Sequence, residues 1–207
     1  RIIARLAQLK LLQFLHRRLC YVKNVKQAVS AVPKALAWWT RRYPDSVIDR
    51  PILYLMALSS ESSPLVVATM IRRLALSREQ AKNVRVGGSR IDRARERLTD
   101  TRAIRPSQAY RHLEEFSNEA LVLLLARQVA MRHEVLLRRL KRNLVSYVKS
   151  RTVKTSLTGG DLQAMGLKPG PQYKTILGKL LGARIDGMIT TETEERAFVQ
   201  RWVGMAE

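Results

Sequence analysis

Cysteine, glycine, proline and long apolar runs are all scarce in this sequence. A single cysteine, Cys20, excludes an internal disulfide framework and a cysteine-rich zinc module, and it is typical of a reducing compartment. Ten glycines and seven prolines are too few for a collagen-like or low-complexity chain. No uncharged stretch approaches the roughly 20 apolar residues that a membrane-spanning helix needs. The sequence therefore predicts a cytoplasmic protein that does not enter a membrane.

Acidic residues are also scarce, and positive charge is in large excess. The chain has 38 Lys and Arg against 17 Asp and Glu, a formal net charge of +21 in 207 residues. Because so many cations lack an internal acid and repel one another, an anionic partner is favoured. The apolar share of 46% is too high for a disordered basic tail. The composition therefore predicts a globular protein that binds nucleic acid.

Apolar residues recur at steps of three and four along most of the chain, which predicts amphipathic helices. The first such stripe predicts one helix and consists of Ile2, Ile3, Leu6, Leu9, Leu12 and Leu15. Residues 47–58 are almost wholly apolar and predict a buried helix. No segment shows the strict alternation of a half-buried strand. We therefore expect an all-α fold, with a multi-helix body followed by a small three-helix tail.

Helix-start signals and a change of composition divide the chain. Capping-box spacing, in which residues three apart close the first helical turn, occurs at Ser77 with Gln80, Thr158 with Asp161, and Thr191 with Glu194. The polar, basic segment 149–156 predicts a linker. We therefore expect a helical body over residues 1–150 and a helical tail over residues 151–207, with a hairpin turn at Pro169-Gly170-Pro171.

The sequence offers no convincing catalytic or metal site. His16, His112 and His133 lie far apart in helical patterns, where a lone histidine is usually structural. The segment Gly87-Gly88-Ser89, followed by Asp92, superficially matches the start of a nucleotidyltransferase motif. Two-metal phosphoryl transfer needs a second carboxylate, however, and the sequence lacks one there. We therefore predict that this chain carries no catalytic residue and no metal ligand.

Basic residues are the candidates for binding. One group of arginines consists of Arg72, Arg73, Arg90, Arg93, Arg95, Arg97, Arg102 and Arg105. A second basic group, of arginines and lysines, runs from Arg138 to Lys154. In the tail, the helix that follows the Pro-Gly-Pro turn presents backbone N–H groups and a helix dipole, which attract anions, although the turn would also serve as a plain connection. The predicted RNA-binding residues are Arg90, Arg93, Arg97, Arg138, Arg139, Arg142, Lys168, Gly170 and Lys174.

Two adjacent tryptophans are a further candidate. Trp38 and Trp39, with Tyr43, could form a platform on which bases stack. Adjacent helical residues cannot face the same way, so we expect one tryptophan in the core and the other near the surface.

The tail resembles the C-terminal tail of bacterial tRNA nucleotidyltransferases, the class of CCA-adding enzymes, A-adding enzymes and poly(A) polymerases. The residues that carry the resemblance are Leu157–Leu162, Gly166–Pro171, Ile176-Leu177, Leu180-Leu181 and Asp186-Gly187. Tyr173-Lys174 departs from the small and apolar residues that are usual after the turn. The resemblance of the body, over Leu6–His16 and Pro51–Leu76, is one of pattern only.

The resemblance implies an all-helical body and tail that hold the acceptor stem and elbow of a tRNA. The catalytic head, which would use Mg²⁺ with ATP, alone or with CTP, to add nucleotides to the RNA 3′ end, does not lie in this sequence. Some family members carry DHH and paired CBS modules ahead of the head. The chain begins inside a helical pattern, so we expect a fragment of a longer protein.

Two other functions fit the composition. One is a basic helical DNA-binding or chromosome-associated module, and the other is a scaffold for an acidic protein. The choice between CCA, A and poly(A) addition stays open, because in the family it lies in the neck and head.

Overall fold

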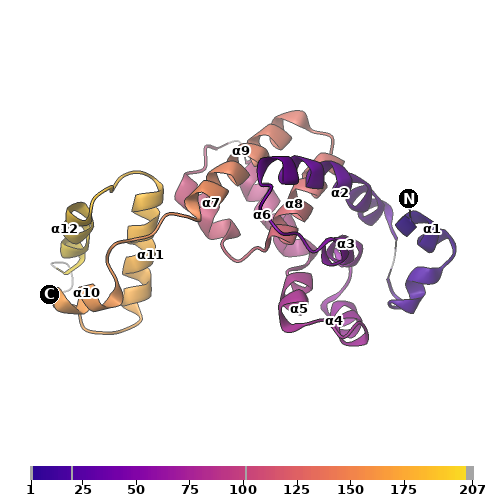
Figure 1. The fold of residues 1–207 in the computed structure, drawn as a ribbon, viewed down its shortest axis with the longest axis horizontal. Helices are drawn as coiled ribbons and strands as arrows, with labels where there is room; N and C mark the ends of the chain where they lie inside the picture. Colours follow the sequence, from indigo (N-terminus) through magenta and orange to yellow (C-terminus); the bar gives the residue numbers. More distant parts are fainter. Residues whose placement is uncertain (1, 20, 101, 204–207) are drawn as a thin grey trace. The chain divides into compact units, whose positions relative to one another are not determined.

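The computed structural model describes residues 2–19, 21–100 and 102–203, and Figure 1 shows the chain as helices joined by loops. These residues form twelve α-helices and one short 3-10 helix, with no strand among them, so the predicted all-α fold is confirmed. In this part of the chain no helix has the length and apolar character to cross a membrane. Cys20 lies outside the described residues.

The chain divides into two compact units. The first comprises residues 1–101 and 115–141, and the second comprises residues 102–114 and 142–207. The first contains α1 (Ile2–Gln8), η1 (Leu11–Phe14), α2 (Lys23–Arg42), α3 (Arg50–Ser59), α4 (Pro64–Arg73), α5 (Arg78–Arg85), α6 (Gly87–Thr99), α8 (Asn118–Ala130) and the start of α9 (Glu134–Ser150). The second contains α7 (Pro106–Leu113), the rest of α9, α10 (Gly159–Ala164), α11 (Gln172–Ile185) and α12 (Glu192–Val203). The boundary predicted near residue 150 stays a prediction of domain organisation.

Helix α8 is the centre of the first unit. Residues 120–126 are apolar and buried without interruption, and α2, α3 and α6 pack against this helix. The apolar side of α2, which includes Val25, Val32 and Trp39, is turned inward. A helix that is apolar on all sides, such as α8, is stable only when other helices cover it completely. The three surrounding helices therefore depend on α8 for their common core.

A buried carboxylate links three helices of this unit. Glu119 accepts hydrogen bonds from the backbone N–H of Asp49 (2.9 Å) and from Asn83 Nδ2 (3.4 Å). Asp49 in turn caps α3 through the N–H of Ile52 (3.1 Å) and accepts from Gln80 Nε2 (3.1 Å). The ends of α3, α5 and α8 are thereby fixed to one another.

Two predicted helices have different bounds in the structure. The helix expected over residues 47–58 begins only at Arg50, because Asp49 caps it, and Val47 is 86% exposed. The first amphipathic helix ends at Gln8, and Lys10 adopts a left-handed φ of 56° before η1. No residue of α1 is buried, so the prediction of a single core-facing helix through Leu15 was wrong.

The tail has a core of its own. Three helices, α10, α11 and α12, enclose Leu157, Leu162, Leu167, Ile176, Leu180, Ala183, Ile189 and Val199. The predicted capping boxes of Thr158 with Asp161 and of Thr191 with Glu194 are both formed, as is that of Ser77 with Gln80. Hydrogen bonds from Thr158 and Thr190 lower the pKa values of Asp161 and Glu194, respectively. The predicted three-helix tail is therefore present.

Glu195 is the fully buried carboxylate of this tail. It accepts hydrogen bonds from the backbone N–H groups of Ser156 (3.0 Å) and Leu157 (2.9 Å), and it forms an ion pair with Arg184 (2.6 Å). These bonds attach the segment before α10 to both α11 and α12.

We predict that Glu195→Ala destabilises the tail by about 3–5 kcal/mol, because it leaves a guanidinium and two N–H groups without their acceptor. Native-state hydrogen exchange of the α11 amides measures this free energy. The control is Glu192→Ala, which removes an exposed ion pair with Arg196 and should change the same free energy by no more than about 0.5 kcal/mol. Equal effects of the two substitutions would contradict this role of Glu195.

Candidate RNA-binding surface

Helix α6 presents three of the predicted arginines on one side. Its buried side contains Ile91, Ala94 and Leu98. Arg90, Arg93 and Arg97 are exposed, and their spacing of three and four residues places them together on the opposite side. The structure therefore brings these three candidates into one row.

Two contacts within this row leave the charges accessible. Arg90 forms an ion pair with Glu115, and both side chains are at least half exposed. Arg93 Nε donates to the carbonyl of Ser89 at 3.3 Å. Exposed ion pairs contribute little free energy, so an anionic ligand can compete for such arginines.

The start of α6 is shaped by a close approach to α3. Gly87 has a left-handed φ of 62°, which separates α6 from α5. At Gly88, a Cβ atom would lie 1.9 Å from the carbonyl oxygen of Ser60, so only glycine fits there. The Gly-Gly pair therefore has a structural role in this fold.

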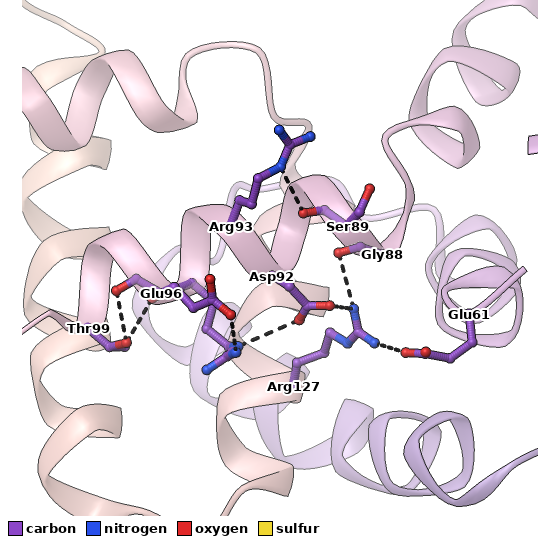
Figure 2. A network of polar contacts seen from close by, with 9 residues as sticks. Glu61, Gly88, Ser89, Asp92, Arg93, Glu96, Thr99 and Arg127 are labelled. Atoms are coloured by element: carbon purple, nitrogen blue, oxygen red, sulfur yellow. Dashed lines mark hydrogen bonds and ion pairs between the residues drawn. The ribbon is translucent and has the colours of Figure 1, made fainter. Parts of the chain in front are cut away.

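Below the row, Arg127 of α8 anchors α6 from inside (Figure 2). Arg127 is 9% exposed, and its Nη1 donates to Asp92 Oδ2 at 2.7 Å and to the carbonyl of Gly88 at 3.2 Å. Its Nη2 forms an ion pair with Glu61. Asp92, the carboxylate after the Gly-Gly-Ser segment, is thus held by a guanidinium. In the described ranges no three His, Cys, Asp or Glu residues gather as metal ligands.

The candidates on α9 have different environments. Arg138 and Arg142 are exposed, and they lie one helical turn apart. Arg139 is half-buried, and its Nη1 donates to the carbonyls of Thr99, at 2.9 Å, and Asp100. These carbonyls belong to the end of α6, where backbone acceptors lack partners within the helix. Arg139 therefore stabilises the end of α6.

The two tryptophans are divided as expected. Trp39 is 1% exposed, and its Nε1 donates to Ser46 Oγ at 3.0 Å. Trp38 is half-buried, and Lys141 Nζ lies 5.5 Å from the centre of its ring. One tryptophan is in the core and the other near the surface, which confirms that prediction. The ammonium group of Lys141 covers a face on which a base would stack.

The tail places Lys168, Gly170 and Lys174 around the start of α11. All three residues are exposed. Gly170 has no left-handed φ, and a Cβ atom added there would have Gln172 Cδ, at 3.9 Å, as its nearest neighbour, so neither backbone nor packing requires glycine. Tyr173, the departure noted in the sequence, donates from its hydroxyl to the carbonyl of Leu167 at 2.7 Å and packs on the tail core.

Lys174 also lines a groove of about 430 Å³ between α7 and α11 in the second unit. Arg111 of α7 and Lys179 of α11 are on the same groove. Asp186 joins the two helices, because its carboxylate accepts from the N–H (2.9 Å) and the hydroxyl (2.7 Å) of Ser107. The tail candidates are therefore accompanied by two cations that the sequence analysis did not single out.

Sequence reasoning also missed a group on α5. Arg78, Lys82 and Arg85 line a hollow of about 800 Å³ together with Arg90. Their spacing of four and three residues places them on the side of α5 opposite the buried Ala81 and Val84, and this spacing could have indicated a row of cations from the sequence alone.

Comparisons with known proteins agree with the resemblance seen in the tail. No family model matches the chain. The chain is similar to the A-adding tRNA nucleotidyltransferase of Geobacter sulfurreducens, with 29% identity over 204 residues. This alignment covers 96% of the chain but only 22% of that enzyme. The similarity to bacterial tRNA nucleotidyltransferases is thus confirmed, and the chain spans about a fifth of this curated relative.

Solved structures show the same fold. The Thermotoga maritima CCA-adding enzyme complexed with tRNA has a TM-score of 0.69 and 18% identity, covering 99% of this chain and 47% of that one. An apo form of a CCA-adding enzyme has a TM-score of 0.74 and 19% identity, covering 98% of this chain and 45% of that one. The similarity extends over body and tail alike.

The arginines of α9 should respond differently to substitution. We predict that Arg139→Ala lowers the free energy of unfolding of the first unit by about 1–3 kcal/mol, because the two carbonyls at the end of α6 lose a charged donor. Arg138→Ala and Arg142→Ala should each change stability by no more than about 0.5 kcal/mol, since both side chains are exposed. Urea unfolding of the three variants, followed by circular dichroism, makes the comparison. Equal stability of all three would show that Arg139 has no structural role.

Proposed function

We propose that this chain is the RNA-binding body and tail of a longer nucleotidyltransferase that adds nucleotides to tRNA 3′ ends. The observation that carries the proposal is the exposed arginine row Arg90, Arg93 and Arg97 on α6, in a chain of net charge +21 that is similar to an A-adding enzyme. A protein that held these cations for solubility alone would not need them in such excess.

Binding would depend on the shape and charge of the RNA. Guanidinium groups bind phosphates with two parallel hydrogen bonds, so a row of arginines follows a strand without reading its bases. Double-helical RNA is recognised mostly through its backbone, because its deep major groove excludes side chains. The partner would be the acceptor stem and elbow of a tRNA. The tRNA complex of a similarly folded enzyme supports this choice.

The chemistry of the proposed parent protein would lie outside this chain. Mg²⁺ with ATP, alone or with CTP, would be used by a catalytic head, because the Gly-Gly-Ser segment of this chain is followed by a single carboxylate, Asp92, which is engaged by Arg127. The product would be A, CCA or a poly(A) tail. This chain would hold the tRNA so that the 3′ end of the tRNA reaches that head.

In the tail, the start of α11 would receive an RNA phosphate. The first N–H groups of an α-helix lack acceptors within the helix, and the helix dipole favours negative charge there, although the N–H of Tyr173 donates to the Gly170 carbonyl at 3.1 Å. Lys168 and Lys174 flank the turn and would add their charge. The lack of a side chain at Gly170 would let the phosphate approach the backbone closely.

Competition should separate RNA from DNA binding. We predict that this chain binds tRNA more tightly than duplex DNA of equal length, and that the affinity falls steeply with salt, by a log–log slope of roughly 0.7–0.9 for each neutralised phosphate. The double variant Arg138→Ala/Arg142→Ala should reduce that slope by the equivalent of one or two phosphate contacts. Filter binding at several salt concentrations measures both quantities. Preference for duplex DNA would favour the DNA-binding alternative, and preference for an acidic protein would favour the scaffold.

The tail turn gives a test in which stability and binding change separately. Gly170→Ala should fold normally, because a Cβ there meets only ordinary contacts. Gly170→Glu should also fold, since a negative charge near the start of a helix is favourable, but we predict that it binds tRNA more weakly than Gly170→Ala. Thermal unfolding and tRNA titration of both variants provide the comparison. Unchanged affinity in a folded Gly170→Glu variant would leave the turn as a plain connection.

A further inference from the structure

The hollow beside α5 combines four cations with two carboxylates. It has a volume of about 800 Å³ and lies within the first unit. Its walls come from α5, the start of α6 and the segment before α8, and its lining consists of Arg78, Glu79, Lys82, Arg85, Val86, Arg90 and Glu115. Only Arg90 was among the residues expected to bind RNA.

The three cations of α5 form one stripe. Arg78, Lys82 and Arg85 are all exposed, whereas Ala81 and Val84 on the other side of the helix are buried. At 1.5 Å of rise per residue, successive cations are about 6 and 4.5 Å apart along the helix axis. Such a stripe can contact successive phosphates of one strand.

The stripe is held on a fixed support. Ser77 and Gln80 close a capping box at the start of α5, and Gln80 Nε2 also donates to Asp49 Oδ2 at 3.1 Å. Asn83 Nδ2 donates to the buried carboxylate of Glu119 at 3.4 Å. These contacts fix the side of α5 away from the hollow, so little ordering of the helix would be needed on binding.

The cations of α5 form no ion pair within the described residues 2–19, 21–100 and 102–203, although Lys82 and Arg85 lie in its last turn, where the helix dipole favours positive charge. Arg78 is the first residue of α5, where the helix dipole disfavours a cation. Their mutual repulsion would be relieved by an anion in the hollow.

We propose that this hollow binds the ribose–phosphate backbone of an RNA strand, as a contact that shares only Arg90 with the arginine row on α6. This inference rests on the proposed function. Arg78, Lys82 and Arg85 bind successive phosphates, and Arg90 exchanges its exposed ion pair with Glu115 for a phosphate. Glu79 and Glu115 would repel a bare phosphate or a nucleoside triphosphate. Beside an RNA strand they instead accept hydrogen bonds from ribose 2′-hydroxyl groups, which DNA lacks.

The test compares two variants that each lose three exposed cations. One is Arg78→Ala/Lys82→Ala/Arg85→Ala, and the control is Lys23→Ala/Lys26→Ala/Arg41→Ala on α2. Alanine is the best helix former, so both helices should persist, and circular dichroism checks this. For the α5 variant we expect at least about a tenfold loss of tRNA affinity at 0.1 M salt and a log–log slope reduced by about two to three contacts. The control should lose no more than about threefold.

A second arm identifies the ligand by titrating ATP, inorganic phosphate and an all-DNA version of the tRNA stem into the wild-type chain. We expect the all-DNA stem to bind more weakly than tRNA. The double variant Glu79→Gln/Glu115→Gln should reduce this difference in affinity between RNA and DNA. If the wild-type chain and the α5 variant bind tRNA with equal affinity, the hollow is not an RNA contact, and the proposed function still stands. ATP or phosphate binding that only the α5 variant loses, with unchanged tRNA affinity, would make it a small-anion site. A wild-type chain that binds no tRNA overturns the proposed function, and this inference with it.

Discussion

The structure depends on a few carboxylates that form hydrogen bonds and ion pairs inside the fold. With 17 acids against 38 Lys and Arg, most cations cannot be neutralised within the chain. The acids that matter most have structural positions: Glu119 joins the ends of three helices, Glu195 holds the tail together, and Asp186 fixes the start of α7. Carboxylates engaged inside the fold cannot neutralise arginines on its outside. The unmatched positive charge of the surface follows mainly from the net charge of +21, and the carboxylates engaged inside the fold add to it.

The same use of the carboxylates also explains which arginines are available to a partner. Arg127 and Arg139 are engaged within the fold, one by Asp92, Glu61 and Gly88, the other by the end of α6. Arg93, Arg138 and Arg142 extend into solvent from the same helices or their neighbours. A guanidinium that donates to acceptors of a neighbouring helix is thus structural, whereas an exposed one opposite a buried apolar stripe can bind an external anion.

The sequence predicted features whose determinants are local. The capping boxes at Ser77, Thr158 and Thr191 involve residues three apart, and all three are formed. It could not predict that Glu119 fixes Asp49, the cap of α3, because the two residues are 70 positions apart. Nor could it reveal that Arg139 serves the end of α6, a contact across 40 positions. The α5 stripe was visible as a spacing of charges, but its hollow exists only because Arg90 and Glu115 lie beside it.

The fold shared with CCA-adding enzymes does not by itself assign a function, since function resides in particular surfaces. The central claim is that tRNA covers the unmatched cations and leaves the structural ones as they are. Chemical modification of lysine and arginine side chains, followed by mass spectrometry with and without tRNA, tests it most directly. The account predicts protection by tRNA at Arg93, Lys82 and Lys174, with no change at the buried Arg127. Equal modification of the exposed residues in both states would contradict it.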